Sequence, residues 1–408
     1  MSSLKYWVWL ACVGGVGSVA GAQLLKRFGT PEMVFLADPK EYRETEGFRP
    51  AVFSQLAQKN LDAANRILAS CQQLGHRVMT IHDAGYPDRL RNIYDPPLVL
   101  YVRGNLPVVD DEAAVAVVGT RNCSAYGMTT AENIGRRLAQ RGLLVVTGLA
   151  RGIDSAAARG ALMGGGRVIG VIGSGTDVVY PSENRSLFDD VAASGAIISE
   201  YPPGTPALPG HFPARNRILS GLSLGVAVIE APKRSGALIT ASRALEQGRD
   251  VFTLPGNVGA RSCEGSNALL REGAIPVLSA EDIIAEYEEL YPEKIVPDMK
   301  THTVSPGATG DEPTGNQNQG GRGVRGLHKK GIDNITAVDY IDVDKIVSEL
   351  SGDERAVAET IGTATMHVDE IIVSSNLSAP QVLTALTMLE INGFAAREAN
   401  GNWKLEGR

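Results

Sequence analysis

The sequence has few cysteines and no metal-binding motif. Its four cysteines, Cys12, Cys71, Cys123 and Cys263, are scattered without a C-x-x-C pair, and its six histidines form no H-E-x-x-H pattern. This spacing argues against a zinc site or a disulfide framework and favours a reducing compartment. A G-x-x-x-x-G-K-[ST] loop is also absent, which excludes a P-loop ATPase. We therefore expect a cytoplasmic protein that needs no metal ion or other cofactor.

The sequence also lacks a net positive charge and a long apolar run. A net charge of −7 counts against a protein that coats duplex DNA through bulk electrostatics, so any nucleic-acid contact must be concentrated in a local groove. No stretch reaches the roughly 20 apolar residues of a membrane span without repeated glycines. Residues 5–22 could pass as a secretory signal, but a glycine turn and a helix that ends at Gly29 suit them better. We expect no membrane association.

Composition and the pattern of apolar residues divide the 408 residues into four regions. Residues 1–75 predict a small helical domain of the sterile-alpha-motif or helix-hairpin-helix type. Residues 76–290 alternate apolar β-branched runs with helices, which predicts an α/β domain with an extended Rossmann-like, doubly wound and mostly parallel sheet. Residues 291–343 are rich in Gly, Pro, Asn and Thr and predict a flexible linker. Residues 344–408 predict a winged-helix-like domain, whose hairpin turns at Asn400-Gly401.

The last predicted helix of this tail, Ala379 to Asn392, contains neither lysine nor arginine. A helix that reads DNA needs such donors for phosphates and base edges. We therefore interpret the tail as a protein-docking module, with DNA reading as the alternative.

The central domain concentrates polar residues where its strands end. The predicted strands cover residues 115–118, 143–146, 168–172, 196–199, 226–229 and 251–254. Because parallel strands end at one edge of a sheet, the loops that follow them meet there. These loops contain glycines that allow close approach of a ligand, hydroxyl donors, and arginines whose guanidinium forks suit phosphate oxygens. The residues are Gly119, Gly173, Ser174, Ser235, Thr240, Arg121, Arg215, Arg217 and Arg234.

Dispersed arginines with nearby aromatic rings favour a groove that follows a nucleic-acid strand over a pocket for one nucleotide. The rings on which bases could stack are Tyr126, Tyr180, Tyr201 and Phe212. Other interpretations of the same residues stay open.

Structural roles are the main alternative. Arg215 or Arg217 could pair with Glu200 or Glu230 and hold the loops together, and Asp154 is most simply a helix cap. A further alternative is a Mg²⁺ site formed by acidic residues near the strand ends, although their spacing does not select it. These residues are Asp154, Asp177, Glu200 and Glu230.

The segments "VVGTRNCSAYG", "TGLARGID", "YPSENRSLF", "FPARNRILSGLS" and "SGALITASRALEQGRDVFTLPG", in this order, resemble the DNA-processing protein A family (DprA/Smf). The resemblance covers about residues 75–285. It implies a homodimeric protein that binds single-stranded DNA without known catalysis. It also implies that the protein protects incoming DNA and loads the recombinase RecA onto it during natural transformation.

The resemblance also implies roles for individual residues. Arg121 and Ser124 would contact the DNA backbone. Some relatives carry a lysine where this chain has Ser182, so either Arg185 replaces that lysine or the contact is missing here. The groove would be lined or braced by Arg215, Asn216 and Arg217, and closed by Ser235, Gly236 and Thr240.

An enzyme on the same fold is the competing interpretation. The sheet also looks like that of nucleotide-cleaving phosphoribohydrolases, which carry P-G-G-x-G-T-x-x-E. This chain has "PKRSGALITASRALE" in the comparable region and lacks the paired glycines.

Overall fold

A computed structural model describes residues 3–42, 50–297, 350, 352–361, 366–375, 377–392, 394–397 and 402–405. The chain forms two compact units, residues 1–305 and 306–408. The predicted linker from residue 298 onward and the Asn400-Gly401 turn lie outside the described residues. In the described ranges, no helix is both long and apolar enough to cross a membrane.

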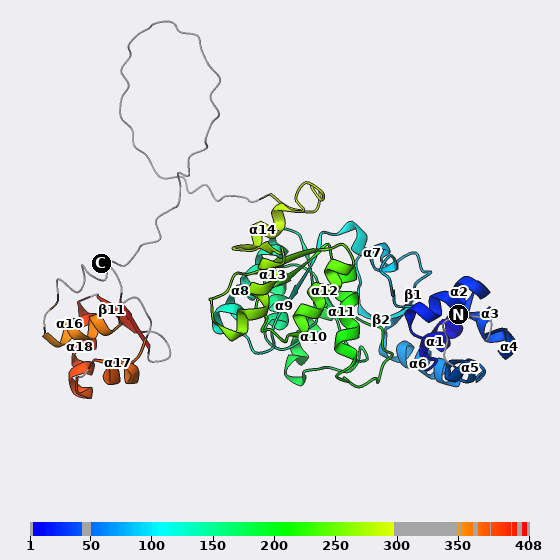
Figure 1. Ribbon diagram of the computed structural model, residues 1–408, viewed down its shortest axis with the longest axis horizontal. Coiled ribbons are helices and arrows are strands. Elements are labelled where there is room, and N and C mark those ends of the chain that lie inside the picture. Colours follow the sequence, from blue (N-terminus) through cyan, green and yellow to red (C-terminus); the bar gives the residue numbers. More distant parts are fainter. Residues whose placement is uncertain are drawn as a thin grey trace, which may run out of the picture. The chain divides into compact units, whose positions relative to one another are not determined.

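The first unit is built on one large sheet. The described part of this unit is coloured from blue to yellow in Figure 1. Within it, the sheet contains nine strands in the order β1-β2-β6-β5-β4-β3-β7-β8-β9. The strands from β3 to β9 run parallel, whereas β1 and β2 are antiparallel additions at one edge. The mostly parallel, doubly wound sheet is thus confirmed. The strands are β1 (Arg77–Thr80), β2 (Val99–Gly104), β3 (Ala114–Val118), β4 (Leu144–Thr147), β5 (Val168–Val171), β6 (Ala196–Ser199), β7 (Gly225–Val228), β8 (Asp250–Thr253) and β9 (Ile275–Pro276).

Strand order reverses beside β3. Val115 pairs with Val145 of β4 on one side and with Gly225 of β7 on the other. The chain therefore winds from β3 outward through β4, β5 and β6, and returns to start again at β7. A crevice opens at such a reversal, at the carboxyl ends of the strands.

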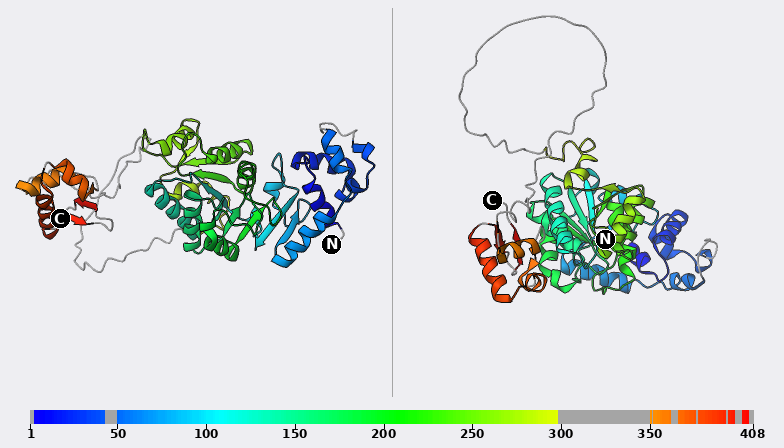
Figure 2. Two further views of the ribbon diagram at one scale, coloured as in Figure 1. Left: turned by 90° about the horizontal axis from the view of Figure 1, so that it is seen from below. Right: turned by 60° about the vertical axis from the view of Figure 1, so that its left-hand side comes forward.

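Helices cover both faces of the sheet (Figure 2), because alternate residues of its buried strands point to opposite sides. Val115 and Val117 of β3 pack under one layer, and Ala116 and Val118 under the other. The first layer contains α8 (Ala125–Gln140), α9 (Ile153–Met163), α10 (Arg185–Ser194) and α14 (Ala280–Ala285). The second contains α7 (Asp88–Arg91), α11 (His211–Leu222), α12 (Gly236–Glu246) and α13 (Glu264–Arg271). Short 3-10 turns lie at η1 (Val109–Asp111), η2 (Ser182–Asn184) and η3 (Arg261–Cys263).

One expectation about local structure is wrong. The sequence places the segment "FPARNR" in a strand-end loop, but it lies inside helix α11. This difference decides where its two arginines point.

The amino-terminal helices pack beside the antiparallel edge of the sheet, where Figure 1 shows them in blue. Trp7, Val8 and Leu24 are buried together with Val99 and Tyr101 of β2. Gly29 ends α2 with a φ of +83°, as the sequence predicts. These helices are α1 (Leu4–Cys12), α2 (Ser18–Phe28), α3 (Pro31–Leu36), α4 (Pro39–Tyr42), α5 (Pro50–Leu56) and α6 (Asp62–Leu74).

The second unit has the predicted winged-helix-like arrangement. In its described ranges, the helices α16 (Gly352–Ile361), α17 (Val368–Ser374) and α18 (Ala379–Ile391) pack on a small sheet around Val357, Leu386 and Trp403. The hairpin strands β11 (Ala395–Arg397) and β12 (Asn402–Leu405) are joined by an additional strand, β10 (Met366–His367).

Candidate nucleic-acid interface

A cleft of about 570 Å³ opens at the carboxyl ends of β3 and β7, where the strand order reverses. Its walls come from the loop after β3, the start of α11, and the loop that leads from β7 into α12. Eight of the predicted site residues line it: Gly119, Arg121, Arg215, Asn216, Arg234, Ser235, Gly236 and Thr240.

The floor of the cleft contains a buried acidic residue and a buried arginine. Asp154 accepts hydrogen bonds from the backbone nitrogen atoms of Gly119 (3.3 Å) and Gly148 (3.1 Å). Arg215 donates to the carbonyl oxygen of Val171 and is only 5% exposed. A Cβ atom added at Gly148 would lie 2.6 Å from Oδ2 of Asp154 and 2.5 Å from Nη2 of Arg215, so both side chains pack directly against this glycine.

Burial shifts the pKa values of both members of this pair. Burial raises the pKa of Asp154 to about 6, although the charge of Arg215 and the backbone hydrogen bonds oppose the increase. Burial likewise lowers the pKa of Arg215 to about 10. Asp154 is not the helix cap that the sequence suggested: Gly152 precedes α9, and the Asp154 carboxylate binds the ends of two strands instead.

The walls of the cleft present exposed positive charge. Arg121 and Arg234 are exposed, and within the described residues neither has an ion-pair partner. The Arg121 guanidinium lies over the Phe212 ring, 5.1 Å from its centroid, and Tyr180 lies 5.5 Å from the same ring, centroid to centroid. Two cationic groups and an aromatic pair are therefore available to a ligand in the cleft.

The wall at α12 is held by local hydrogen bonds. Ser235 caps the helix by accepting from the backbone nitrogen of Ala237 at 3.3 Å. Asn216 donates from Nδ2 to the carbonyl oxygen of Gly236 at 3.1 Å, and Thr240 donates to the same oxygen at 3.5 Å. Gly236 itself faces open space, so its backbone is accessible.

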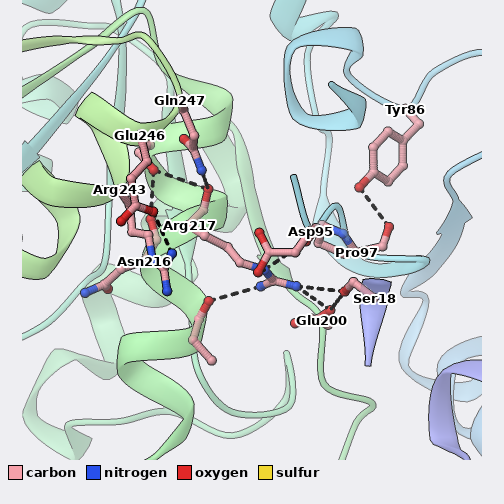
Figure 3. A network of polar contacts seen from close by, with 12 residues as sticks. Ser18, Tyr86, Asp95, Pro97, Glu200, Asn216, Arg217, Arg243, Glu246 and Gln247 are labelled. Carbon is pink, nitrogen blue, oxygen red and sulfur yellow. Dashed lines mark hydrogen bonds and ion pairs between the residues drawn. The ribbon is translucent and has the colours of Figure 1, made fainter. Parts of the chain in front are cut away.

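Arg217 points away from the cleft. Its Nη2 donates to Glu200 at 2.7 Å and to the Ser18 hydroxyl at 3.0 Å, and its Nε lies 3.1 Å from Oδ2 of Asp95 (Figure 3). Burial alone would lower the pKa of Arg217, but Glu200 and Asp95 raise it above its ordinary value. At 6% exposed, Arg217 links α11 to the amino-terminal helices, which is the structural alternative that the sequence left open.

Four other predicted residues also lie off the cleft lining. Ser124 caps α8 and donates to Glu230 at 2.5 Å. Ser174 is 2% exposed and donates to the carbonyl oxygen of Val178, and Gly173 is buried against His211. Arg185 is exposed at the start of α10. Whether any of the predicted residues contacts DNA stays a prediction.

Comparison with known proteins identifies the family. A family model described as DNA recombination-mediator protein A matches residues 77–288, and one described as DprA winged helix domain matches residues 345–401. Protein Smf of Synechocystis is 39% identical over 288 residues, which are 70% of this chain and 72% of that protein. This chain belongs to the DprA/Smf family.

Relatives named DprA agree with this assignment. DprA of Streptococcus pneumoniae is 47% identical over 209 residues, which are 51% of this chain and 73% of that protein. An X-ray structure of DprA from S. pneumoniae superposes with a TM-score of 0.62 and 37% identity, covering 69% of this chain and 97% of that chain. The family resemblance and the fold class predicted from the sequence are both confirmed.

The acidic residues considered for a Mg²⁺ site bind different partners in this DprA/Smf fold. Asp154 binds strand-end amides, Glu200 binds Arg217, Glu230 binds Ser124, and Asp177 accepts from the backbone nitrogen of Gly204 at 2.8 Å. The described ranges contain no group of three or more His, Cys, Asp or Glu side chains that could hold a metal ion.

Sequence reasoning missed the roles of the two buried carboxylates. Asp154 and Glu230 both follow strand ends, but their sequence context resembles an ordinary helix start and an ordinary loop. The aromatic pair could be found, because the sequence places Tyr180 and Phe212 in segments that follow predicted strands. Tyr126 and Tyr201, which the same reasoning selected, do not line the cleft.

Proposed function

We propose that this protein binds single-stranded DNA without sequence preference and acts in DNA processing, without catalysing a reaction. The observation that carries the proposal is the pair of exposed arginines, Arg121 and Arg234, on different walls of the cleft at the strand reversal. Guanidinium groups bind phosphates, which carry no base code, and Phe212 and Tyr180 offer ring faces for stacking, which every base can use.

The wider role rests on family membership. Relatives from Bacillus subtilis and S. pneumoniae are named DNA processing protein DprA. We propose for this chain that a homodimer in the cytoplasm protects incoming strands and loads RecA onto them during natural transformation. Sedimentation of the full chain tests the dimer, and RecA filament assembly on protein-coated single strands tests the loading. A monomer, or RecA assembly that the protein does not accelerate, would contradict these parts.

The central test is fluorescence anisotropy with labelled single-stranded and duplex DNA over a salt series. We expect Arg121→Ala to weaken single-strand binding for every sequence. The slope of the logarithm of the binding constant against the logarithm of the salt concentration should become shallower by about 0.7 for each phosphate that the variant no longer neutralises. Arg136→Ala serves as the matched control, because Arg136 lies well along α8 and away from the cleft lining. Equal affinity of folded wild type and Arg121→Ala would refute the assignment of the cleft.

A further inference from the structure

The turn from β3 into α8 is the position where a doubly wound fold ordinarily holds a nucleotide phosphate. Backbone amides and the positive end of the helix dipole favour an anion at the first strand-to-helix turn. Helix α8 is 16 residues long and begins after Ser124, so it retains the dipole. Only one glycine, Gly119, stands where a nucleotide fingerprint has several.

An anion from the protein itself already occupies this turn. Oε2 of Glu230 accepts from the Ser124 backbone nitrogen at 2.8 Å, and Oε1 accepts from the Ser124 hydroxyl at 2.5 Å. Ser124 in turn accepts from the backbone nitrogen of Gly127 at 2.9 Å. Glu230 is only 2% exposed, so its side chain is buried within the turn.

Packing fixes the carboxylate in this place. A Cβ atom at Gly127 would lie 2.5 Å from Cδ of Glu230, which means that the carboxylate rests directly on the first turn of α8. The backbone nitrogen of Thr120 donates to the Glu230 carbonyl oxygen at 2.7 Å, which ties the loop after β3 to the end of β7. Glu230 therefore holds the loop that carries Arg121.

A second carboxylate binds neighbouring backbone amides in the same way. Asp154 accepts hydrogen bonds from the backbone nitrogen atoms of Gly119 and Gly148, which follow the ends of β3 and β4. The amides of Gly119, Ser124 and Gly148, at the turns after β3 and β4, are thus bound to acidic side chains of the chain itself. Anion binding is left to the guanidinium groups of the cleft.

We infer that Glu230 is a specificity-determining residue, which occupies the anion position at the start of α8 and keeps the phosphate of a mononucleotide out of it. The inference rests on the proposed function in one respect: it leaves the phosphates of a DNA strand to Arg121 and Arg234. The occupation of the turn by Glu230 stands on the contacts above alone.

The test compares full-length wild type, Glu230→Ala and Glu230→Gln. Alanine removes the side chain that fills the anion position, whereas glutamine removes the charge and keeps the position filled. The probes are inorganic phosphate and adenosine monophosphate. The first readout is the midpoint of thermal unfolding in phosphate, compared with the midpoint in chloride at equal ionic strength. The second is the dissociation constant for adenosine monophosphate, measured by calorimetry.

We expect phosphate to raise the thermal midpoint of Glu230→Ala more than that of wild type or Glu230→Gln. Adenosine monophosphate should bind Glu230→Ala about tenfold more tightly than wild type, or more, which is the effect of one charge-assisted hydrogen bond. Equal responses of Glu230→Ala and wild type to both probes would overturn the inference. If Glu230→Ala is unfolded without phosphate, folding on addition of phosphate supports the inference, and failure to fold overturns it.

Single-strand DNA binding by wild type is measured in the same series and decides a separate question. If wild type fails to bind DNA while Glu230→Ala gains phosphate binding, the proposed function is wrong and the role of Glu230 stands. If wild type binds DNA and Glu230→Ala gains nothing, the proposed function stands and the role of Glu230 is wrong.

Discussion

Replacing Arg217 by alanine removes the guanidinium that links α11 to Glu200, Asp95 and Ser18. Arg217 belongs to the motif for which the family resemblance implies a place in the DNA groove. Its contacts in the structure are instead to the segment before β2, the loop after β6 and the start of α2. The variant therefore separates a bracing role from a DNA-contact role.

The expected loss of stability follows from the burial of the partners. Breaking a buried ion pair by removing one partner costs about 3–5 kcal/mol, because the other charge is left without compensation. The side chains of Glu200 and Asp95 are 25% and 30% exposed, so water solvates part of each carboxylate once the guanidinium is gone. We therefore expect the lower end, about 3 kcal/mol, which lowers the melting temperature by roughly 5 °C for a unit of 305 residues.

The assay combines thermal unfolding with single-strand DNA binding at a temperature where the variant is folded. We expect Arg217→Ala to melt earlier, while its DNA affinity changes by less than about twofold, since Arg217 does not line the cleft. Arg243→Ala is the matched control, because its surface pair with Glu246 contributes less than about 1 kcal/mol. Tenfold weaker DNA binding with an unchanged melting temperature would refute the bracing role.

Three further predictions concern the cleft and the tail. Phe212→Ala should weaken single-strand binding by about 1–3 kcal/mol through loss of base stacking, as measured by anisotropy; an unchanged affinity would exclude stacking on this ring. Because burial raises the pKa of Asp154 from 3.8 to about 6, the folded state holds this proton more tightly than the unfolded state. The stabilisation is present below about pH 4 and is lost as the pH rises through 6. The free energy of unfolding of wild type, relative to that of Asp154→Asn, should therefore fall by about 3 kcal/mol over this interval. If urea titrations show the same difference between the two proteins at every pH, the raised pKa is contradicted. Deleting residues 344–408 should leave single-strand affinity largely intact, because α18 contains no lysine or arginine, and a large loss would show that the tail binds DNA.

The strands could be predicted because their signal is local. Each parallel core strand is a short apolar run between polar segments, and burial on both faces is the usual reason for such a run. The edge of the sheet at which the loops meet could also be predicted, because parallel strands all end at the same edge. Eight predicted residues do line one cleft there, among them Arg121 and Arg234.

The roles of individual arginines could not be predicted, because they depend on helix geometry and on distant partners. Arg215 and Arg217 are two positions apart, and in a helix this separation turns side chains by about 200°, to opposite sides. Arg215 therefore faces the cleft, whereas Arg217 faces the amino-terminal helices. The partners Asp95 and Ser18 lie 122 and 199 positions away along the chain, and no local pattern connects them to Arg217.

The distribution of paired and unpaired arginines explains how a chain of net charge −7 can offer a site to a polyanion. Many arginines of the first unit are ion-paired, among them Arg89, Arg141, Arg167 and Arg217, so their charge is locally balanced. Arg121 and Arg234 have no such partner within the described residues. The carboxylates of Asp154 and Glu230, in contrast, accept hydrogen bonds from backbone amides after the strand ends. The cleft thus contains two guanidinium groups whose charge no carboxylate of the described residues balances. We therefore expect the cleft to favour phosphates presented by a flexible strand over a compact nucleotide, which would need the amides that Glu230 and Asp154 bind.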